Sequence, residues 1–527
     1  MAQQVIPGYL PAALSRYSFR TSPFGARLCG AVASHMSYEC AHSGTRCSCA
    51  RVRAHGGVEM PAQLTTRAQV NGYRFLLQRF EHALVRRDVR MLHDPMRIQF
   101  RSLLTGLVLA VLVTAGCGVL AFLRPQGQLG DAKIIMAGDS GALYVMVDKT
   151  MHPVLNLASA RLITGTSESP TSVQDSKLAS VPRGPMLGIP GAPASLPGAV
   201  DRDRSEWTLC EDATDGLRST VLDGVPQLGP QIRPASPDEA VLATYDGATY
   251  LIYDGKHARI DMSSDAVVAT LQIRDMRPRP IGAGLLNATV AAPELLAPAI
   301  PDAGAPSAVR VANVVVGSVI RVQGVNGAQP YVVLADGVQK ISEFTAQVLR
   351  TSNSMGHTVI PLLSPDAIGG LPVLNTLPIG QFPVGVPSIV AMDTDPVACA
   401  SWARSASDQA ATLRLLVGRQ LPLASGRTPV RLVGGEAAHT AYIPAASGEF
   451  VQATGIELDS TRRDGLFYVT DTGVRFGIPD AATAVVLGQT AEPKLVPWQI
   501  ISQLPAGPML DRRSALIARD VVRTGGA

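Results

Sequence analysis

An uncharged apolar run of 22 residues, from Ser102 to Leu123, divides this chain of 527 residues into two unequal parts. A helix rises 1.5 Å per residue, so a run of this length extends about 33 Å, which is enough to cross the hydrocarbon core of a membrane. A helix buried in a soluble core is the alternative, but the run is apolar on every face. We therefore expect one transmembrane helix over residues 102–123.

Arginines are concentrated on the N-terminal side of this run. Between residues 66 and 101 there are eight arginines and three acidic residues, whereas the charges beyond the run are sparse and mixed. Positively charged flanks of a span remain in the cytoplasm, which predicts a cytoplasmic N-terminus and an outer C-terminal part. A lipoprotein cleavage site before Cys117 is a rival interpretation. It fits poorly, because Thr114 is polar where an aliphatic residue is expected and the apolar run continues past the cysteine.

The part before the span has two regions. Residues 1–59 are rich in Arg and Ser, as in an organelle transit peptide, but we prefer a disordered extension or a start assigned too early, with Met60 as the true start. Residues 60–101 carry apolar residues at intervals of three and four, which predicts an amphipathic cytoplasmic helix. Such a helix could lie on the membrane surface or dock on a partner protein. Its candidate contact residues are Tyr73, Phe80, Arg86 and Arg87.

Four segments beyond the span repeat one pattern. Each has a tyrosine, then a turn sequence, then a β-branched residue ten positions after the tyrosine, then a helical segment. Asp-Gly and related pairs between apolar runs favour tight β-hairpins. The tyrosines are Tyr144, Tyr250, Tyr331 and Tyr468, and the β-branched residues are Val154, Ile260, Ile341 and Ile478. The turn residues are Asp148-Lys149, Asp254-Gly255, Asp336-Gly337 and Thr472-Gly473.

The spacing of the four segments suggests how they are arranged. A hairpin with one helix cannot bury its own apolar face, so such units pack on one another or on a shared centre. The tyrosines are 106, 81 and 137 residues apart, and the excess falls at residues 189–243 and 382–454. We therefore predict an α+β protein in which four hairpin-helix modules surround a β-rich central domain made of these two segments. The predicted modules cover residues 124–188, 244–300, 301–381 and 455–527, the last with a C-terminal tail.

Cysteine is rare beyond residue 124, where only Cys210 and Cys399 occur. Each lies three residues from a tryptophan, Trp207 or Trp402, in a short apolar segment, so the two segments could pair as neighbouring strands. In an oxidising compartment the two cysteines would form a disulfide. Two unrelated buried thiols are the alternative.

No catalytic or cofactor motif is present. The chain has no G-x-x-x-x-G-K-[ST] phosphate loop, no H-E-x-x-H and no G-x-S-x-G. The net charge is +4 without a dense Lys/Arg tract, which argues against a nucleic-acid partner. We predict no catalytic residue, no metal site and no cofactor.

Several stretches together resemble the EccB family of type VII (ESX) secretion systems. They are "QVNGYRFLLQRFEHALVRRDVRMLHDPMR", the single span, "LRPQGQLGDAKIIMAGDSGALYVMVDKTMHPVLNLASARLITG", "RGPMLGIPGAP" and "DTGVRFGIPD". The resemblance runs from about Met60 to near the C-terminus. It implies a cytoplasmic helix, one span and a periplasmic part with four repeat domains around a central domain. It also implies a disulfide across that part, here Cys210–Cys399, and repeats similar in fold to a cell-wall-binding phage lysin subunit.

The resemblance also implies a function and partners. EccB-like proteins assemble with EccC, EccD and EccE into an inner-membrane core complex and supply its periplasmic mass, and the mycosin protease is associated with it. We therefore predict a structural subunit that also contacts membrane lipid and further copies of itself. One alternative is a module that binds peptidoglycan. Another is a nucleotide hydrolase, because the family is often labelled ATPase, but EccC is the expected motor.

Overall fold

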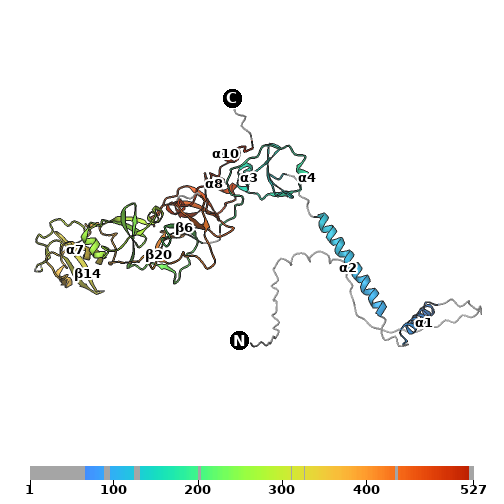
Figure 1. Cartoon of the computed structure of the whole chain (residues 1–527), viewed down its shortest axis with the longest axis horizontal. Coiled ribbons are helices and arrows are strands. Elements are labelled where there is room, and N and C mark those ends of the chain that lie inside the picture. The colour runs from blue at the N-terminus through green and yellow to red at the C-terminus, as the bar shows by residue number, and fades with distance from the viewer. Residues whose placement is uncertain are drawn as a thin grey trace, which may run out of the picture. The chain divides into compact units, whose positions relative to one another are not determined.

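The computed structural model describes residues 66–87, 95–123, 131–199, 203–309, 311, 313–325, 327–433 and 437–520 (Figure 1). The predicted extension at residues 1–59 lies outside these ranges. The chain divides into two compact units, residues 1–114 and residues 115–527.

Helix α1 (Arg67–Arg86) is the predicted amphipathic helix. Its first turn is closed by a capping box: Gln69 N donates to Thr66 Oγ1 (3.4 Å), and Thr66 N donates to Gln69 Oε1 (3.0 Å). The helix ends at Arg87, whose φ of 54° is left-handed and turns the chain out of the helix.

Helix α2 (Pro95–Leu123) contains the predicted span. Proline is tolerated at its first position because the N–H groups of the first turn have no partner within the helix. The window Phe100–Val119 has a mean hydropathy of 2.1, and none of it is buried within the protein. Among the described residues, this is the one helix that is long and apolar enough to cross a membrane.

The largest sheet of the second unit has seven strands in the order β21-β22-β6-β5-β19-β20-β7. They come from two distant segments: β5 (Arg204–Asp212), β6 (Arg218–Asp223) and β7 (Ile232–Pro234), then β19 (Val397–Ser405), β20 (Thr412–Gly418), β21 (Val430–Arg431) and β22 (Thr440–Tyr442). The segments meet where β5 and β19 pair antiparallel over nine residue pairs. This central sheet has the two-segment origin that the sequence predicts.

Four smaller sheets share one connectivity. In each, three antiparallel strands are followed by a helix, then by a strand parallel to the first of the three. A short helix then leads to a segment that runs parallel to the third strand. We name these sheets modules 1 to 4, at residues 134–187, 239–295, 319–374 and 448–506.

The elements of the modules have the following bounds. Module 1 contains β1 (Ile134–Ala137), β2 (Leu143–Val147), β3 (Thr150–Pro153), α3 (Leu157–Thr164), β4 (Thr171–Val173) and α4 (Asp175–Leu178). Module 2 contains β8 (Glu239–Tyr245), β9 (Ala248–Tyr253), β10 (Lys256–Ile260), α5 (Asp265–Leu271), β11 (Arg279–Pro280), α6 (Ala283–Asn287) and β12 (Val290–Leu295), and β18 (Ser388–Ile389) pairs with β8. Module 3 contains β13 (Val319–Gly324), β14 (Gly327–Leu334), β15 (Gly337–Lys340), α7 (Glu343–Ser352), β16 (Leu362–Leu363), a 3-10 turn η1 (Pro365–Ala367) and β17 (Val373–Leu374). Module 4 contains β23 (Gly448–Thr454), β24 (Leu466–Thr470), β25 (Arg475–Ile478), α8 (Ala481–Val486), β26 (Lys494–Pro497) and α9 (Trp498–Ile501), and α10 (Arg512–Ala515) follows it.

Hairpins form at all four predicted places. The β-branched residues that follow each tyrosine by ten positions are buried on the sheet face that the helix of the module covers; they are Val154, Ile260, Ile341 and Ile478. In modules 1 and 2 the two-residue turns are the predicted Asp148-Lys149 and Asp254-Gly255. All four of these turn residues have positive φ, as a type I′ turn requires.

The turn of module 3 differs from the prediction by one residue. Leu334 pairs with Gly337, so Ala335 and Asp336 form the turn and Gly337 begins β15. A Cβ at Gly337 would lie 2.3 Å from the Pro372 carbonyl oxygen. Glycine is therefore required there by the close approach of the chain beside β17, not by the turn.

Tyr468 of module 4 is displaced by one strand position from the other three tyrosines. In modules 1 to 3 the residue after the tyrosine packs toward the helix, whereas in module 4 Tyr468 itself does so. Phe467 therefore occupies the position of the other tyrosines. The turn of module 4 is one residue longer, Asp471 to Gly473, with Gly473 at a φ of 79°. The extra turn residue adds one position between the tyrosine and Ile478, and the shift of the tyrosine removes one. Tyr468 and Ile478 are therefore still ten positions apart, and this spacing does not reveal the shift.

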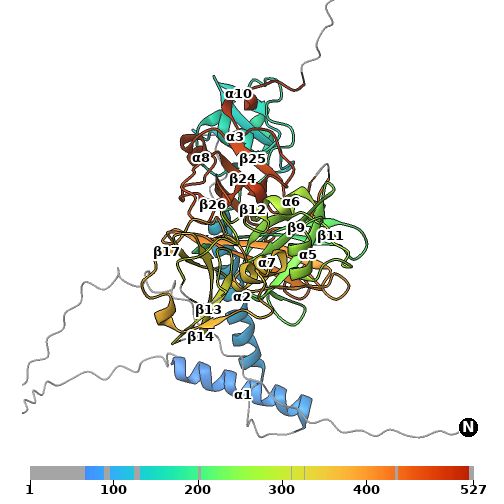
Figure 2. The ribbon, with the colours of Figure 1, turned by 90° about the vertical axis from the view of Figure 1, so that its left-hand side faces the viewer.

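The modules share hydrophobic cores in pairs. Helices α3 and α8 lie in one core that joins modules 1 and 4, and α10 packs against α3 in the same place (Figures 1 and 2). Helices α5 and α7 join modules 2 and 3 in the same way. A third and larger core joins the central sheet to modules 2 and 4.

Candidate functional site

The centre of the second unit is closed by a disulfide between Cys210 and Cys399. The two cysteines are direct partners in the β5–β19 register, with a Cα–Cα distance of 4.0 Å. Trp207 and Trp402 are also direct partners in that register. Both the predicted disulfide and the predicted pairing of the two segments are therefore confirmed.

The two faces of this strand pair have different roles, because successive side chains of a strand point to opposite faces. Trp207 and Trp402 are fully buried in the core that modules 2 and 4 share with the central sheet. Cys210 and Cys399 lie in a separate small core on the other face. The strand pair thus fixes the sheet covalently on one face and packs against neighbouring modules on the other.

Glu211, next to the disulfide, joins the central sheet to module 2. The residue is 2% exposed, and its carboxylate accepts hydrogen bonds at the start of α6, from Gly282 N (2.8 Å) and Leu285 N (3.3 Å). Burial raises the pKa of the Glu211 carboxyl to about 7, although these hydrogen bonds and one from Ser219 lower it. A carboxyl that titrates near neutral pH therefore lies in this junction.

Arg279 of β11 forms a second link between module 2 and the central sheet. Its guanidinium is buried and donates to the carbonyl oxygens of Asp395 and Pro396, immediately before β19. Burial lowers the pKa of Arg279 to about 10, and nearby carboxylates, with Asp395 foremost, oppose that shift. No sequence pattern pointed to Glu211 or Arg279, because each is an isolated charge whose partners lie far along the chain.

Two segments hold modules 1 and 4 together. They are the linker after module 1 (residues 188–199) and the C-terminal segment after module 4 (residues 507–520). Tyr468 Oη of module 4 donates to the Pro197 carbonyl oxygen of the linker (2.8 Å). Arg519, near the end of the described chain, donates from Nε to the Gly188 carbonyl oxygen (2.9 Å). These contacts connect residues more than 250 positions apart with backbone carbonyls as acceptors.

Two of the four candidate contact residues of α1, Tyr73 and Phe80, are exposed aromatic side chains. Tyr73 is 66% exposed and Phe80 is 72% exposed, so no described part of the protein covers them. Arg87 forms the left-handed end of the helix, and the side chain of Arg86 lies outside the described residues. Whether these four residues make contacts with lipid or protein stays a prediction.

The structure does not gather the hairpin residues of the four modules into one site, since each set belongs to its own sheet. Among the described residues, no group of three or more His, Cys, Asp and Glu side chains is placed to hold a metal ion. The repeat residues that the sequence singles out therefore lie in the turns, strands and cores of separate modules.

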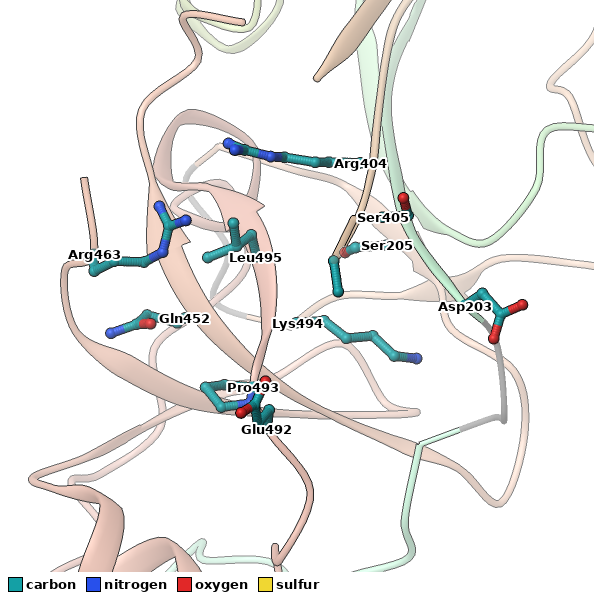
Figure 3. Close-up of a pocket in the computed structure, with 11 residues that line it drawn as sticks. Asp203, Ser205, Arg404, Ser405, Gln452, Arg463, Glu492, Pro493, Lys494 and Leu495 are labelled. Carbon is teal, nitrogen blue, oxygen red and sulfur yellow. The ribbon is translucent and has the colours of Figure 1, made fainter. Parts of the chain in front are cut away.

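A polar cleft of about 420 Å³ lies between the central sheet and module 4 (Figure 3). The central sheet contributes Ser205 from β5 and Arg404 and Ser405 from β19. Module 4 contributes residues of β23, of β26 and of the loop between β23 and β24, among them Lys494 and Arg463. No sequence signal pointed to this cleft, because its walls come from five separate stretches of the chain.

Comparison with known proteins decides the family. The family model described as "Type VII secretion system ESX-1, transport TM domain B" matches residues 62–524. This chain belongs to the EccB family of type VII secretion components. The resemblance stated from the sequence motifs is therefore confirmed.

Curated relatives cover most of this EccB-family chain. It is 40% identical over 485 residues to "ESX-3 secretion system ATPase EccB3" of Mycolicibacterium smegmatis, covering 89% of this chain and 93% of that protein. It is 36% identical over 472 residues to "ESX-1 secretion system ATPase EccB1" of Mycobacterium tuberculosis, covering 88% and 96%.

Solved EccB structures are similar in fold. A chain of the periplasmic assembly from the ESX-5 inner membrane complex aligns with a TM-score of 0.65 at 36% identity, covering 77% of this chain and all of that one. A chain of an intact ESX-5 inner membrane complex gives 0.67 at 35% identity, covering 89% and 98%. The EccB3 dimer from the ESX-3 core complex gives 0.65 at 36% identity, covering 74% and all of that chain. This chain is thus an α+β protein with one apolar helix near its N-terminus and a β-rich body of several sheets that resembles an EccB periplasmic assembly.

Proposed function

We propose that this EccB-family chain is a structural subunit of the inner-membrane core complex of a type VII secretion system, and that residues 131–520 form part of its periplasmic body. The observation that carries the proposal is the alignment over the whole of a chain from the solved ESX-5 periplasmic assembly. Helix α2 supplies the membrane span, and the arginines on its N-terminal side orient residues 1–101 toward the cytoplasm.

The proposed periplasmic body consists of a central domain that packs against modules 2 and 4, with module 1 packed on module 4 and module 3 packed on module 2. The central domain comprises the seven-stranded sheet, while β8 and β23 extend modules 2 and 4 into the regions first assigned to the centre. The disulfide, the shared core and the links through Glu211 and Arg279 support this arrangement. A body with this many fixed junctions suits a scaffold that holds other subunits in place.

The proposed partners are EccC, EccD, EccE and the mycosin protease, together with further copies of this chain. Self-association is supported by the solved dimer of the EccB3 relative. The exposed face of α1, with Tyr73 and Phe80, is the proposed contact with a cytoplasmic subunit or with lipid headgroups. Helix α2 is the proposed contact with membrane lipid.

Deletion of the gene followed by native analysis of the membrane complex tests the assembly role. We expect the high-mass complex and the secretion of its substrates to be lost, and both to return with the full-length chain. Normal secretion without the protein would overturn the proposal. A peptidoglycan-anchoring role instead predicts that the complex still assembles in the deletion strain and that the full chain binds purified cell wall.

Substitutions on α1 separate its contact from general folding. Phe80→Ser removes an exposed aromatic side chain from the apolar face, and Glu81→Gln is the matched control on the neighbouring position. We expect Phe80→Ser to reduce recovery of the complex with a tagged copy while the amount of protein in the membrane is unchanged. Equal recovery for both variants would show that this face of α1 makes no contact needed for assembly.

The names of the relatives contain the word ATPase, whereas this sequence contains no phosphate loop. We propose that another subunit, EccC, supplies the energy for transport. The purified full-length chain, free of EccC, is therefore expected to hydrolyse ATP no faster than buffer does. Turnover that follows this chain through purification would assign the activity to it instead.

A further inference from the structure

Five apolar residues of α1 follow a heptad pattern. They recur at intervals of three and four residues, and their side chains are 41% to 77% exposed; they are Val70, Tyr73, Leu77, Phe80 and Leu84. Residues at this spacing form one line along a helix, which we call the α1 seam. A helix with such a line of apolar side chains normally packs it against another element. None of the described residues covers the α1 seam, so it lacks a packing partner there.

The α1 seam is symmetric about Leu77. Val70 and Leu84 each lie seven residues from it, and Tyr73 and Phe80 lie four and three residues from it. If two copies of α1 lie antiparallel with Leu77 at the centre, the two Leu77 side chains pack on each other. Because the helix rises 1.5 Å per residue in both copies, Tyr73 of each copy then meets Phe80 of the other. Val70 of each copy likewise meets Leu84 of the other. A surface that is complementary to itself in this way suits a two-fold contact between identical chains.

Two charged residues at one edge of the α1 seam determine the orientation of such a pair. Arg74 and Glu81 are seven residues apart, so they lie on the same edge, one heptad apart. In the antiparallel pair, Arg74 of each copy lies beside Glu81 of the other, which brings opposite charges together twice. In a parallel pair these two positions would face Gln69 and Leu76, which carry no charge. The charge pattern therefore favours the antiparallel pair.

A lipid surface is the rival partner of the α1 seam. Glu81 is the one acidic residue of α1, and it lies at the edge of the seam, where anionic headgroups would repel it. In the antiparallel pair the same residue is attracted to an arginine. The position of Glu81 therefore favours a second helix over an anionic membrane.

The membrane span keeps two α1 helices within reach of each other. Arg87 ends α1 and Pro95 begins α2, and the chain between these two residues can extend at most about 28 Å. Two copies in one assembly are therefore confined to a thin layer on the same side of the membrane, which raises their effective concentration. A pair of short helices that would be weak in free solution gains from this confinement.

We propose that α1 pairs antiparallel with α1 of a second copy of this chain, through the α1 seam and two contacts between Arg74 and Glu81. The pairing rests on the self-association that is part of the proposed function, and it names a surface for it. It also gives α1 one partner in place of the choice between a cytoplasmic subunit and lipid headgroups.

Cysteine cross-linking of the full-length chain in its own membrane tests the pairing. Cys117 and the four cysteines before residue 60 are replaced by serine, and the disulfide-bonded Cys210 and Cys399 are kept. We expect Leu77→Cys to form a covalent dimer under mild oxidation. His82→Cys, on the opposite side of the helix, is the matched control and should form none.

A second set of cysteine variants tests the antiparallel register. Val70→Cys should form no dimer with itself, because two Val70 residues would lie about 21 Å apart along the pair. It should form a dimer with Leu84→Cys when the two variants are produced together. A parallel pair predicts the reverse of both results.

Exchange of the charges at the edge of the α1 seam separates a second helix from lipid. Arg74→Glu and Glu81→Arg each place like charges together, and each should lower the yield of the Leu77→Cys dimer at least about threefold. The double variant Arg74→Glu/Glu81→Arg restores opposite charges and should restore the dimer. An anionic membrane predicts that Glu81→Arg holds α1 more tightly and that Arg74→Glu alone weakens the contact.

Three results would overturn the pairing. The first is no Leu77→Cys dimer in membranes that contain the high-mass complex, which would leave the assembly role intact. The second is a Val70→Cys dimer as abundant as the Leu77→Cys dimer. The third is a Leu77→Cys dimer whose yield neither single charge change reduces. A Leu77→Cys dimer in membranes that lack the high-mass complex would instead contradict the assembly role and support the pairing.

Discussion

Cys210 on β5 and Cys399 on β19 are direct register partners in adjacent antiparallel strands, and their sulfur atoms form a disulfide. The bond joins positions 189 residues apart, across all of module 2 and module 3. Without this contact, the central sheet would be held together by hydrogen bonds and side-chain packing alone. The covalent link therefore fixes which two segments make the centre of the molecule.

Removing the disulfide should destabilise the protein strongly. A cross-link that closes a loop of this length restricts the unfolded chain, and its loss typically costs about 4 kcal/mol. We expect the double variant Cys210→Ala/Cys399→Ala to unfold at clearly lower urea concentration than the unaltered chain. The control is Cys117→Ala in α2, an exposed cysteine outside the disulfide, which should have no such effect. Equal urea midpoints for the double variant and the control would contradict the structural role of the bond.

Glu211 should make stability depend on pH. Its carboxyl has a pKa of 4.5 in an ordinary setting and about 7 in the folded protein, so between these values the folded state retains a proton that the unfolded state has lost. Stability from this group is therefore complete below pH 4.5 and decreases as pH rises to 7, by about 3 kcal/mol in total. We expect a higher melting temperature at pH 5 than at pH 8.

Glu211→Gln should remove most of that pH dependence, because the amide keeps an acceptor oxygen for Gly282 N but cannot ionise. Glu168→Gln replaces an exposed glutamate and is the matched control, which should retain the pH dependence of the unaltered chain. If the melting temperature of Glu211→Gln fell between pH 5 and pH 8 as much as that of the unaltered chain, another group would be responsible.

Lys149→Gly should stabilise module 1. Lys149 is the second of the two central residues of a type I′ turn and has a φ of 63°. This left-handed conformation has a higher conformational free energy for a residue with a Cβ than for glycine. We expect a gain of about 0.5–1 kcal/mol in the free energy of unfolding, measured by urea denaturation. The reciprocal change Gly255→Ala in module 2 should lose stability, since its Cβ would lie 2.9 Å from the Leu413 carbonyl oxygen. The same sign for both changes would contradict the turn assignment.

Tyr468→Phe should destabilise the junction between module 4 and the linker. The change removes the hydrogen bond to the Pro197 carbonyl oxygen and leaves that oxygen without its donor, at a cost of about 1–2 kcal/mol. Tyr331→Phe is the control, because the described residues offer its hydroxyl no hydrogen-bond partner. We expect protease cleavage within the linker to become faster in Tyr468→Phe alone. Equal cleavage of both variants would mean that the hydroxyl contributes nothing there.

The hairpins were predictable because their signals are local. Asp148-Lys149 and Asp254-Gly255 determine tight turns through a few neighbouring residues, and the β-branched residues follow at fixed distance. The shift at Tyr468 was hidden because a longer turn and a one-residue register change cancel in the spacing. The burial of the tyrosine side chain distinguishes module 4 from module 1, because Tyr468 is fully buried whereas Tyr144 is only partly buried.

The short parallel strands of modules 2 and 3 had no recognisable sequence signal. Strands β11, β16 and β17 have two residues each, which is too short for an alternating pattern. Their pairing depends on contacts made after a helix has returned the chain to the sheet, as Arg279↔Ala243 shows in module 2. Local periodicity contains no information about such returns.

The cleft and the junction at Glu211 were beyond sequence reasoning for the same reason. Arg404 and Arg463 lie on different walls of one cleft, and no motif connects them. Glu211 lies in an apolar strand and meets its partners 71 and 74 positions later. The disulfide was an exception, because the scarcity of cysteine left a single pair to consider beyond the span.

The redox state of Cys210 and Cys399 in the full-length chain, isolated from its own membrane with free thiols blocked at lysis, is the most direct test of an outward-facing body with a two-segment centre. Proteolysis and mass analysis without reductant should give one linked pair of peptides, from β5 and β19, that separates on reduction. Free thiols at both positions in a folded chain would contradict both the outer location and the closed centre.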